Sequence, residues 1–289
     1  MSTNGTETGQ YILTLSCPDR IGVVAAVATF LTEQGGDIVD SAQFGDRVSG
    51  QFFLRTAFLS TKGVRLTELR AAFAPLAAQY GMNFGFHDAR TKTRTLIMVS
   101  KFGHCLNDLL YRIRIGALPV EVPLVVSNHL DFAQTVAAQG IRFEHMPVTP
   151  DNKARQEQKL LELVEEERID LVVLARYMQV LSPKLCERLP GRVINIHHSF
   201  LPSFKGARPY NQAYERGVKL IGATAHYVTN DLDEGPIIEQ AVERVHHALS
   251  GEDYVAIGRD VESLVLARAV KWHAEHRIVV NNKRTVIFS

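Results

Sequence analysis

Several features that would mark a secreted, zinc-binding or membrane-spanning protein are missing from this sequence. Its three cysteines, Cys17, Cys105 and Cys186, are far apart, and no two of them stand at Cys-x-x-Cys spacing. That pattern indicates neither a disulfide framework nor a zinc knuckle. No apolar run approaches the roughly 18 residues that could span a bilayer, and the polar residues 1–10 do not resemble a signal peptide. We expect a cytoplasmic protein that does not enter a membrane.

An excess of charge of either sign is also missing. The 32 lysines and arginines balance 31 aspartates and glutamates, which gives a formal net charge of +1. Nucleic acids and anionic membrane surfaces attract proteins with a strong basic excess, so the balance argues against both partners. The 289 residues suffice for one large or two modest domains, each with its own core.

Residues 1–88 have the pattern of a small mixed domain. Apolar and β-branched residues predict four strands, at 11–16, 37–44, 51–59 and 82–86. Periodic apolar positions predict one helix after Gly22 and another around 66–80. Pro75 lies inside the second helix and is expected to kink it or break it in two. The order βαββαβ is that of the ferredoxin-like fold.

A short basic linker at 89–94 separates this region from residues 95–289, where strands and helices alternate. Compact apolar strands are expected at 96–100, 122–127, 142–148, 169–175 and 193–197. Helical segments such as 154–167 lie between them, and the alternation predicts a doubly wound, mostly parallel sheet. The expected later elements are an antiparallel pair at 222–228 and 236–240, a long helix at 252–275 and two short strands in the tail.

The polar residues with the clearest chemistry stand where the strand 193–197 ends. Side chains alternate between the two faces of a strand, so Asn195 and His197 share one face. Open α/β sheets bind their ligands at such strand ends. A satisfied polar pair would give the same spacing, so the pair alone leaves both interpretations open.

A longer string around this pair is far more specific, and it reads Asn195-x-His197-x-Ser199-x-Leu201-Pro202-x-Phe204-x-Gly206. It resembles the signature of the formyltransferase superfamily that uses formyltetrahydrofolate. A second superfamily motif, Asp-x-Gly, is matched by Asp233-Glu234-Gly235. The resemblance implies a Rossmann-like formyltransferase fold for residues 95–289 and a cleft that binds 10-formyltetrahydrofolate.

The resemblance also implies catalytic roles for three residues. Asn195 would donate a hydrogen bond to the oxyanion that forms when the formyl carbon is attacked, and a protonated or donor-oriented His197 would supply a second donor. Asp233 would orient the nucleophile, accept its proton and hold the charge state of His197. Such a pair titrates as a unit, and which member takes the first proton stays open.

Six further residues are expected to contact the substrate. The segment 177–182 resembles the superfamily loop that wraps the pterin, in which backbone groups make the hydrogen bonds and side chains pack. The expected substrate-binding residues are Met178, Leu181, Ser199, Leu201, His226 and Val228. For His226 a strand histidine bonded to backbone is an equal alternative, and Arg176 is either a ligand contact or a surface arginine.

The resemblance implies no metal and no bound cofactor. A metal-dependent hydrolase would use His197, His198 and Asp233. Neighbouring side chains on a strand point to opposite faces, which makes joint ligation by the two histidines awkward. His198 is instead expected on a variable loop surface.

The acceptor of the formyl group distinguishes the members of this superfamily. A phosphate-bearing amine needs a glycine-rich loop before a helix, and the corresponding segment 100–107 has one glycine and a bulky Phe102. A basic RNA-binding extension is also missing, which leaves water as the acceptor. The first region resembles an ACT domain through Asp19-Arg20-x-Gly22, and the combination of the two regions resembles the formyltetrahydrofolate deformylase family.

That resemblance implies hydrolysis of 10-formyltetrahydrofolate to formate and tetrahydrofolate. A formyltransferase with another amine acceptor is the nearest alternative, and a catalytically inactive amino-acid sensor that only binds folate is the third. ACT domains often bind amino acids between subunits. The expected partners are therefore 10-formyltetrahydrofolate, a small amino-acid effector if this copy binds one, and further copies of the chain in a homo-oligomer.

Overall fold

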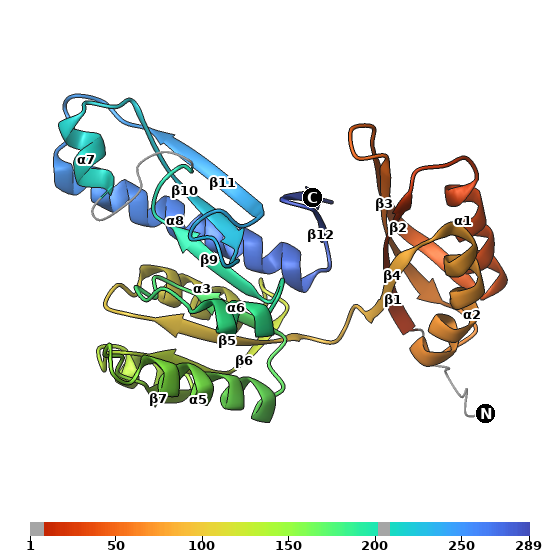
Figure 1. Cartoon of the computed structure of the whole chain (residues 1–289), viewed down its shortest axis with the longest axis horizontal. Coiled ribbons are helices and arrows are strands. Elements are labelled where there is room, and N and C mark those ends of the chain that lie inside the picture. Colours follow the sequence, from red (N-terminus) through yellow and green to blue (C-terminus); the bar gives the residue numbers. More distant parts are fainter. Residues whose placement is uncertain (1–8, 202–208) are drawn as a thin grey trace. The chain divides into compact units, whose positions relative to one another are not determined.

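The computed structural model describes residues 9–201 and 209–289 (Figure 1). The chain divides into two compact units. The first holds the described part of Met1–Thr91 together with Glu275–Asn281 and Val286–Ser289. The second holds the described part of Lys92–Ala274 with Asn282–Thr285. Within these described ranges, no helix has the length and apolar character needed to cross a bilayer.

The first unit is built on a four-stranded antiparallel sheet. Its elements before residue 92 are β1 (Gly9–Pro18), α1 (Val23–Glu33), β2 (Gly36–Asp46), β3 (Gln51–Ser60), α2 (Leu66–Tyr80) and β4 (Asn83–Asp88). The strands lie in the order β2-β3-β1-β4, and α1 and α2 cover one face of the sheet (Figure 1). The predicted ferredoxin-like arrangement is confirmed.

Aromatic rings fill the space between this sheet and its helices. Phe73 on α2 is fully buried and meets Phe30, Phe84 and Phe86 edge-on, at centroid distances of 4.9, 4.8 and 5.5 Å. The helix α2 runs through the exposed Pro75 as one element, so the predicted break is wrong. A proline removes one helical hydrogen bond, which water replaces on an exposed face, while the packing of Phe73 holds both halves on the sheet.

The second unit is built on a seven-stranded sheet with the order β11-β10-β9-β8-β5-β6-β7. Its elements are β5 (Thr93–Val99), α3 (His104–Arg114), β6 (Val120–Ser127), α4 (Ala133–Ala137), β7 (Arg142–His145), α5 (Lys153–Glu166), β8 (Leu171–Leu174), α6 (Pro183–Arg188), β9 (Val193–His197), α7 (Pro209–Glu215), β10 (Leu220–Tyr227), β11 (Ile237–Arg244) and α8 (Gly251–Ala274). The strands β5 to β9 pair in parallel, and β10 and β11 extend the sheet antiparallel. The predicted mostly parallel sheet is confirmed.

Helices cover both faces of the seven-stranded sheet. On one face, α5 and α6 share a buried cluster with Leu96, Met98 and Leu174. On the other face α3 contacts α8, and α8 crosses β9, β10 and β11 (Figure 1). The strand order reverses between β5 and β8, and open sheets bind ligands beside such a reversal, at the carboxyl ends of the strands.

The tail of the chain forms the two short strands that the sequence predicted, β12 (Ile278–Asn281) and β13 (Arg284–Ile287). Part of this tail belongs to the first unit. There Arg55 of β3 donates a hydrogen bond to the carbonyl of Glu275 at 3.2 Å, and Asn281 donates one to Asp46 at 2.9 Å. The part of the tail that belongs to the first unit is thus held to the four-stranded sheet by polar contacts.

Candidate active site

A cavity of about 340 Å³ opens at the carboxyl ends of β8 and β9. Its lining includes the three residues that the sequence predicted to be catalytic, Asn195, His197 and Asp233. Carboxyl ends of neighbouring parallel strands meet at one edge of a sheet, which is where open α/β folds bind their ligands. The fold therefore brings two separate segments, β9 and the loop before β11, to one hollow.

Asn195 stands on β9 between the buried Ile194 and Ile196, and His197 follows Ile196 as the last residue of the strand. His197 is 6% exposed, so its imidazole is almost fully removed from solvent. The strand β10 pairs with β9 in a register that sets His226 beside Asn195. In this pairing Nδ2 of Asn195 lies 3.3 Å from Nε2 of His226.

Asp233 reaches the same hollow from a loop with an unusual backbone. Its φ of 57° lies in the left-handed region, which is strained for a residue other than glycine. Two residues further on, a Cβ at Gly235 would stand 1.7 Å from the carbonyl oxygen of Tyr227, so this close approach requires glycine. The loop sets Oδ2 of Asp233 3.2 Å from Nδ1 of His197 and Oδ1 3.6 Å from Nε2 of His226.

Two imidazoles hold the Asp233 carboxylate in its ionised form. Hydrogen bonds from His197 and then His226 lower the pKa of Asp233 well below its ordinary range, against the opposing effect of burial. The Nδ1 of His226 donates to the carbonyl of Tyr227 at 2.9 Å, so Nε2 is the nitrogen shared by Asn195 and Asp233. His226 lines the cavity and also bonds to backbone, so the predicted backbone bond is confirmed and the predicted substrate contact stays a prediction.

Four of the six predicted substrate-binding residues line this cavity, namely Met178, Leu181, His226 and Val228. Met178 is 52% exposed, although it is apolar. Exposed apolar side chains at the rim of a cavity are suited to contact a flat aromatic ligand, because its burial removes apolar surface from water.

Ser199 and Leu201, the other two, are not among the described residues that line the cavity. Both are buried, and Thr224 on β10 holds their backbone. The Thr224 hydroxyl donates to the carbonyl of Ser199 at 3.0 Å and accepts from the N–H of Leu201 at 3.1 Å. The remaining signature residues Pro202, Phe204 and Gly206 lie outside the described residues.

A buried charged group beside the cavity was not predicted from the sequence. Glu262 on α8 is 1% exposed, and its Oε2 lies 2.7 Å from Nε2 of His104 and 3.3 Å from Nε of Arg176. The hydroxyl of Tyr210 donates to Oε1 at 2.9 Å. Burial opposes ionisation of Glu262, but the hydrogen bond from His104 and the charge of Arg176 outweigh it and lower its pKa.

The sequence contained one signal for the buried Glu262. It is an acidic residue at a position where the predicted helix is otherwise apolar. Glu262 stands next to Val261 and four residues before Leu266, and both neighbours are buried. Its partner Arg176 lines the cavity with a side chain that is 10% exposed. The alternative of a surface arginine is therefore wrong.

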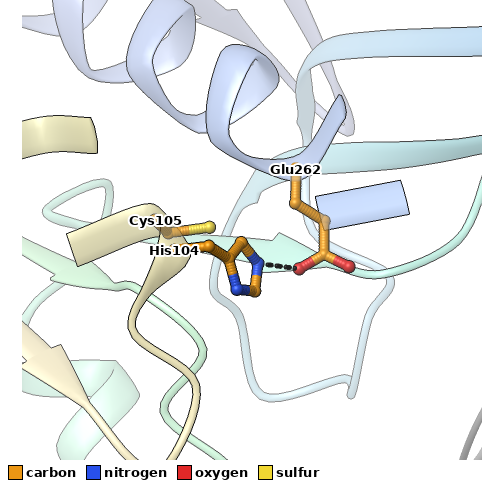
Figure 2. A group of neighbouring side chains, drawn as sticks. All are labelled: His104, Cys105 and Glu262. Carbon is orange, nitrogen blue, oxygen red and sulfur yellow. Dashed lines mark hydrogen bonds and ion pairs between the residues drawn. The ribbon is translucent and has the colours of Figure 1, made fainter. Parts of the chain in front are cut away.

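The donor atoms of His104, Cys105 and Glu262 lie within 4.8 Å of one another, and Figure 2 shows His104 reaching from the start of α3 to the carboxylate on α8. The chemistry of this set does not fit a metal ion. Hydrogen bonds occupy both oxygens of Glu262, and Arg176 sets a positive charge beside them. Burial raises the pKa of the Cys105 thiol far above its ordinary value, so Cys105 is not a thiolate ligand.

The position of His198 corrects two sequence predictions. The strand β9 ends at His197, and the chain then turns so that the two imidazole rings are stacked with centroids 5.2 Å apart. The expectation that the rings point to opposite faces is wrong, and so is the expectation of a surface loop residue. Burial, together with the nearby charge of Arg176, lowers the pKa of His198 to about 4, so its ring is neutral at neutral pH.

Comparison with known sequences gives one family and relatives that share one name. The family model described as formyl transferase matches residues 93–270. A formyltetrahydrofolate deformylase of Corynebacterium sp. (strain P-1) is 50% identical over 279 residues, which cover 96% of this chain and 98% of the relative. One from Bacillus subtilis is 49% identical over 280 residues, which cover 96% of this chain and 93% of the relative.

Solved structures separate two branches of the superfamily. A formyltetrahydrofolate deformylase from Burkholderia mallei is similar with a TM-score of 0.93 and 52% identity, over 97% of this chain and 100% of its own. A glycinamide ribonucleotide transformylase from Symbiobacterium toebii is similar with a TM-score of 0.64 and 31% identity, over 69% of this chain and 95% of its own. The deformylase structure covers 97% of this chain, which includes both units, and the chain belongs to the formyltetrahydrofolate deformylase family.

Proposed function

We propose that this chain hydrolyses 10-formyltetrahydrofolate to formate and tetrahydrofolate. The observation that carries the proposal is the convergence of Asn195, His197 and Asp233 on one cavity, with Asp233 held ionised between two imidazoles. A carboxamide, an imidazole and a carboxylate are the groups that acyl transfer to water needs. Relatives along nearly the whole chain are named for this activity.

Asn195 is proposed to stabilise the oxyanion that forms on the formyl oxygen. Nδ2 of Asn195 lies 3.3 Å from Nε2 of His226, which places the carboxamide beside this ring at the cavity wall. Nδ2 carries two N–H donors, and one of them is proposed to reach the substrate. A donor that is already fixed loses little entropy when charge develops, and such donors supply a large part of catalysis in acyl transfer.

His197 is proposed to move the proton of the attacking water. Its Nδ1 faces Asp233 and its Nε2 has no hydrogen-bond partner among the described residues. The low pKa of Asp233 makes this carboxylate a weak base and a good partner for an imidazolium. We therefore assign the first proton to Nε2 of His197, which would later pass it to the departing nitrogen of the folate.

The folate is proposed to lie against Met178, Leu181 and Val228, which supply apolar lining. Ser199 and Leu201 are proposed to act through the loop that they begin, because Thr224 holds the backbone of both residues. The proposed domain organisation is a regulatory domain at 1–88, a linker at 89–94 and the catalytic domain at 95–289.

Purified protein incubated with 10-formyltetrahydrofolate alone tests the proposal. We expect formate and tetrahydrofolate in equal amounts, without any added amine and with a metal chelator present. Release of tetrahydrofolate only after an amine is added, together with a formylated amine, would instead establish the formyltransferase alternative.

The ACT-like first unit is proposed to assemble copies of the chain and to bind a small amino acid. The edge strand β2 exposes Val39 and Phe44, two apolar side chains that pairing with another copy would cover. Gly22 precedes α1 with a φ of 94° and no side-chain cap, so helix N–H groups are available to a carboxylate. Analytical ultracentrifugation with and without a panel of amino acids tests both parts.

A cytoplasmic location is also proposed. The three cysteines are all buried free thiols, which suits a reducing compartment. Fractionation of cells that express the chain, with detection by antibody, would test the location directly.

A further inference from the structure

Buried side-chain atoms that lack a hydrogen-bond partner belong, among the described residues, to only two side chains. They are Nε and Nη1 of Arg176 and Nε2 of His197, and both residues line the same cavity. Buried polar groups in proteins are nearly always satisfied. Unsatisfied polar atoms on one cavity wall therefore mark where a polar ligand completes the structure. The proposed mechanism uses His197 but gives Arg176 no role.

The backbone of Arg176 supports a functional reason for this residue. It follows β8 with a φ of 65°, a left-handed conformation that favours glycine. An arginine at this position keeps the strain and contributes a long charged side chain to the carboxyl edge of the sheet. Strained residues of this kind concentrate at ligand sites.

The surroundings of Arg176 hold its guanidinium in place without using all of its donors. Nε lies 3.3 Å from Oε2 of Glu262, close enough for an ion pair but not aligned for a hydrogen bond. Glu262 is fixed in turn by His104 and Tyr210. The ring of Phe102 covers the guanidinium at 5.7 Å from the ring centroid. Nη1 is left as a fixed, buried donor.

We propose that Arg176 binds the carboxylate product of hydrolysis, formate, an inference that rests on the proposed function. In that reaction the oxygen of water bonds to the formyl carbon and the bond from this carbon to the folate nitrogen breaks. The nitrogen takes one proton of the water, the other passes to solvent, and formate leaves as an anion. Arginine N–H groups match a carboxylate in charge and in spacing.

The charges around Arg176 suit a product that must leave again. Glu262 places a negative charge 3.3 Å from Nε of Arg176, which weakens the attraction for formate, so binding depends on hydrogen bonds to fixed donors. The neighbouring His198 adds no positive charge, because burial keeps it neutral. Transfer to an amine would yield a neutral amide instead, a product that has no carboxylate for Arg176 to bind.

The test measures formate binding directly, with carbon-13 formate as the NMR probe and no folate present. The main variant is Arg176→Lys, which keeps the positive charge beside Glu262 and the same backbone strain but lacks Nη1. The matched control is Arg259→Gln, because Arg259 also stacks on Phe102 but is exposed and is not among the described lining residues.

We expect that the Arg176→Lys protein must be about tenfold more concentrated than wild type to broaden the formate signal equally. This factor is the scale of a lost charge-assisted hydrogen bond. Arg259→Gln should match wild type. Formate should also inhibit hydrolysis less in Arg176→Lys than in wild type at constant ionic strength. Equal formate binding by wild type and Arg176→Lys would overturn the proposal.

A replacement variant and a separate assay of hydrolysis make every outcome interpretable. If Arg176→Lys does not fold, as judged by a lost unfolding transition, Arg176→Gly replaces it, since glycine accepts the left-handed backbone. The binding measurement needs no turnover, so absence of hydrolysis would contradict the proposed function alone. Hydrolysis by a wild-type protein that does not bind formate would contradict the inference alone.

Discussion

Nδ1 of His197 lies 3.2 Å from Oδ2 of Asp233, although one residue ends a buried strand and the other stands in a loop beyond the next strand. This contact ties the two sequence motifs into a single chemical unit. Nε2 of His197 has no hydrogen-bond partner among the described residues, so it is the nitrogen available to the proposed substrate.

Asp233→Asn should keep the fold and folate binding but lower turnover by roughly a hundredfold or more, the scale of lost proton-transfer catalysis. A carboxamide cannot hold the charge of an imidazolium at His197. Single-turnover release of tetrahydrofolate measures the effect, and folate binding by fluorescence checks the site. Asp231→Asn in the same loop is the matched control, because its exposed side chain also lines the cavity. Wild-type turnover by Asp233→Asn would refute the role of Asp233.

Asn195→Ala should lower kcat by about two orders of magnitude with a smaller change in KM, because one oxyanion donor contributes on the order of 3 kcal/mol to the barrier. Steady-state kinetics separate the two constants. Asn230→Ala is the control, since Asn230 lines the same cavity but bonds to Glu187 at 3.3 Å. An equal loss in both variants would show that the cavity responds to any truncation, and that Asn195 has no special part.

Gly235→Ala should abolish most activity through the position of Asp233. A Cβ at Gly235 would overlap the carbonyl oxygen of Tyr227 at 1.7 Å, so the loop that carries Asp233 must move. Gly251→Ala is the matched control, because its Cβ would meet Tyr214 at an ordinary 3.6 Å. Activity and urea unfolding of both variants measure the effect, and an active Gly235→Ala enzyme would contradict this account of the loop.

Acidification should destabilise the second unit through His273. Burial lowers the pKa of His273 to about 4, because the charged ring would lose its hydration, and its Nδ1 lies 2.7 Å from the Tyr227 hydroxyl. An unfolded histidine has a pKa of about 6.5, so this contribution to the unfolding free energy is complete above that pH and is lost as the pH falls through about 4. The loss from this group at about pH 5 is roughly 2 kcal/mol.

The fluorescence of Trp272 in urea measures this pH dependence, since the chain has one tryptophan. His273→Gln keeps a hydrogen-bonding side chain near Tyr227 and does not titrate, so its unfolding free energy should fall less between about pH 7 and about pH 5. His246→Gln, at an exposed histidine, is the control. Parallel pH curves for wild type and His273→Gln would remove His273 as the cause.

Local sequence pattern determined most of the fold, because it depends on periods that neighbouring residues set. Alternating apolar residues predicted the strands, and the alternation of strands and helices predicted the parallel sheet of the second unit. The position of Asn195 and His197 at the end of β9 followed from the period of two. The break expected at Pro75 does not occur, because packing of Phe84 and Phe86, which are distant in sequence from Pro75, against Phe73 of α2 outweighed a local signal.

The tertiary structure alone decided which polar groups share a cavity and which charges are buried. No spacing in the sequence shows that Glu262 on the last long helix meets Arg176 after β8, because the burial of a charge depends on partners that only the packed chain supplies. The register of β10 on β9 likewise chose His226 as the partner of Asn195. The sequence by itself determined which reactive side chains the site contains. The fold determined how they are arranged, because long-range contacts decide what each side chain faces.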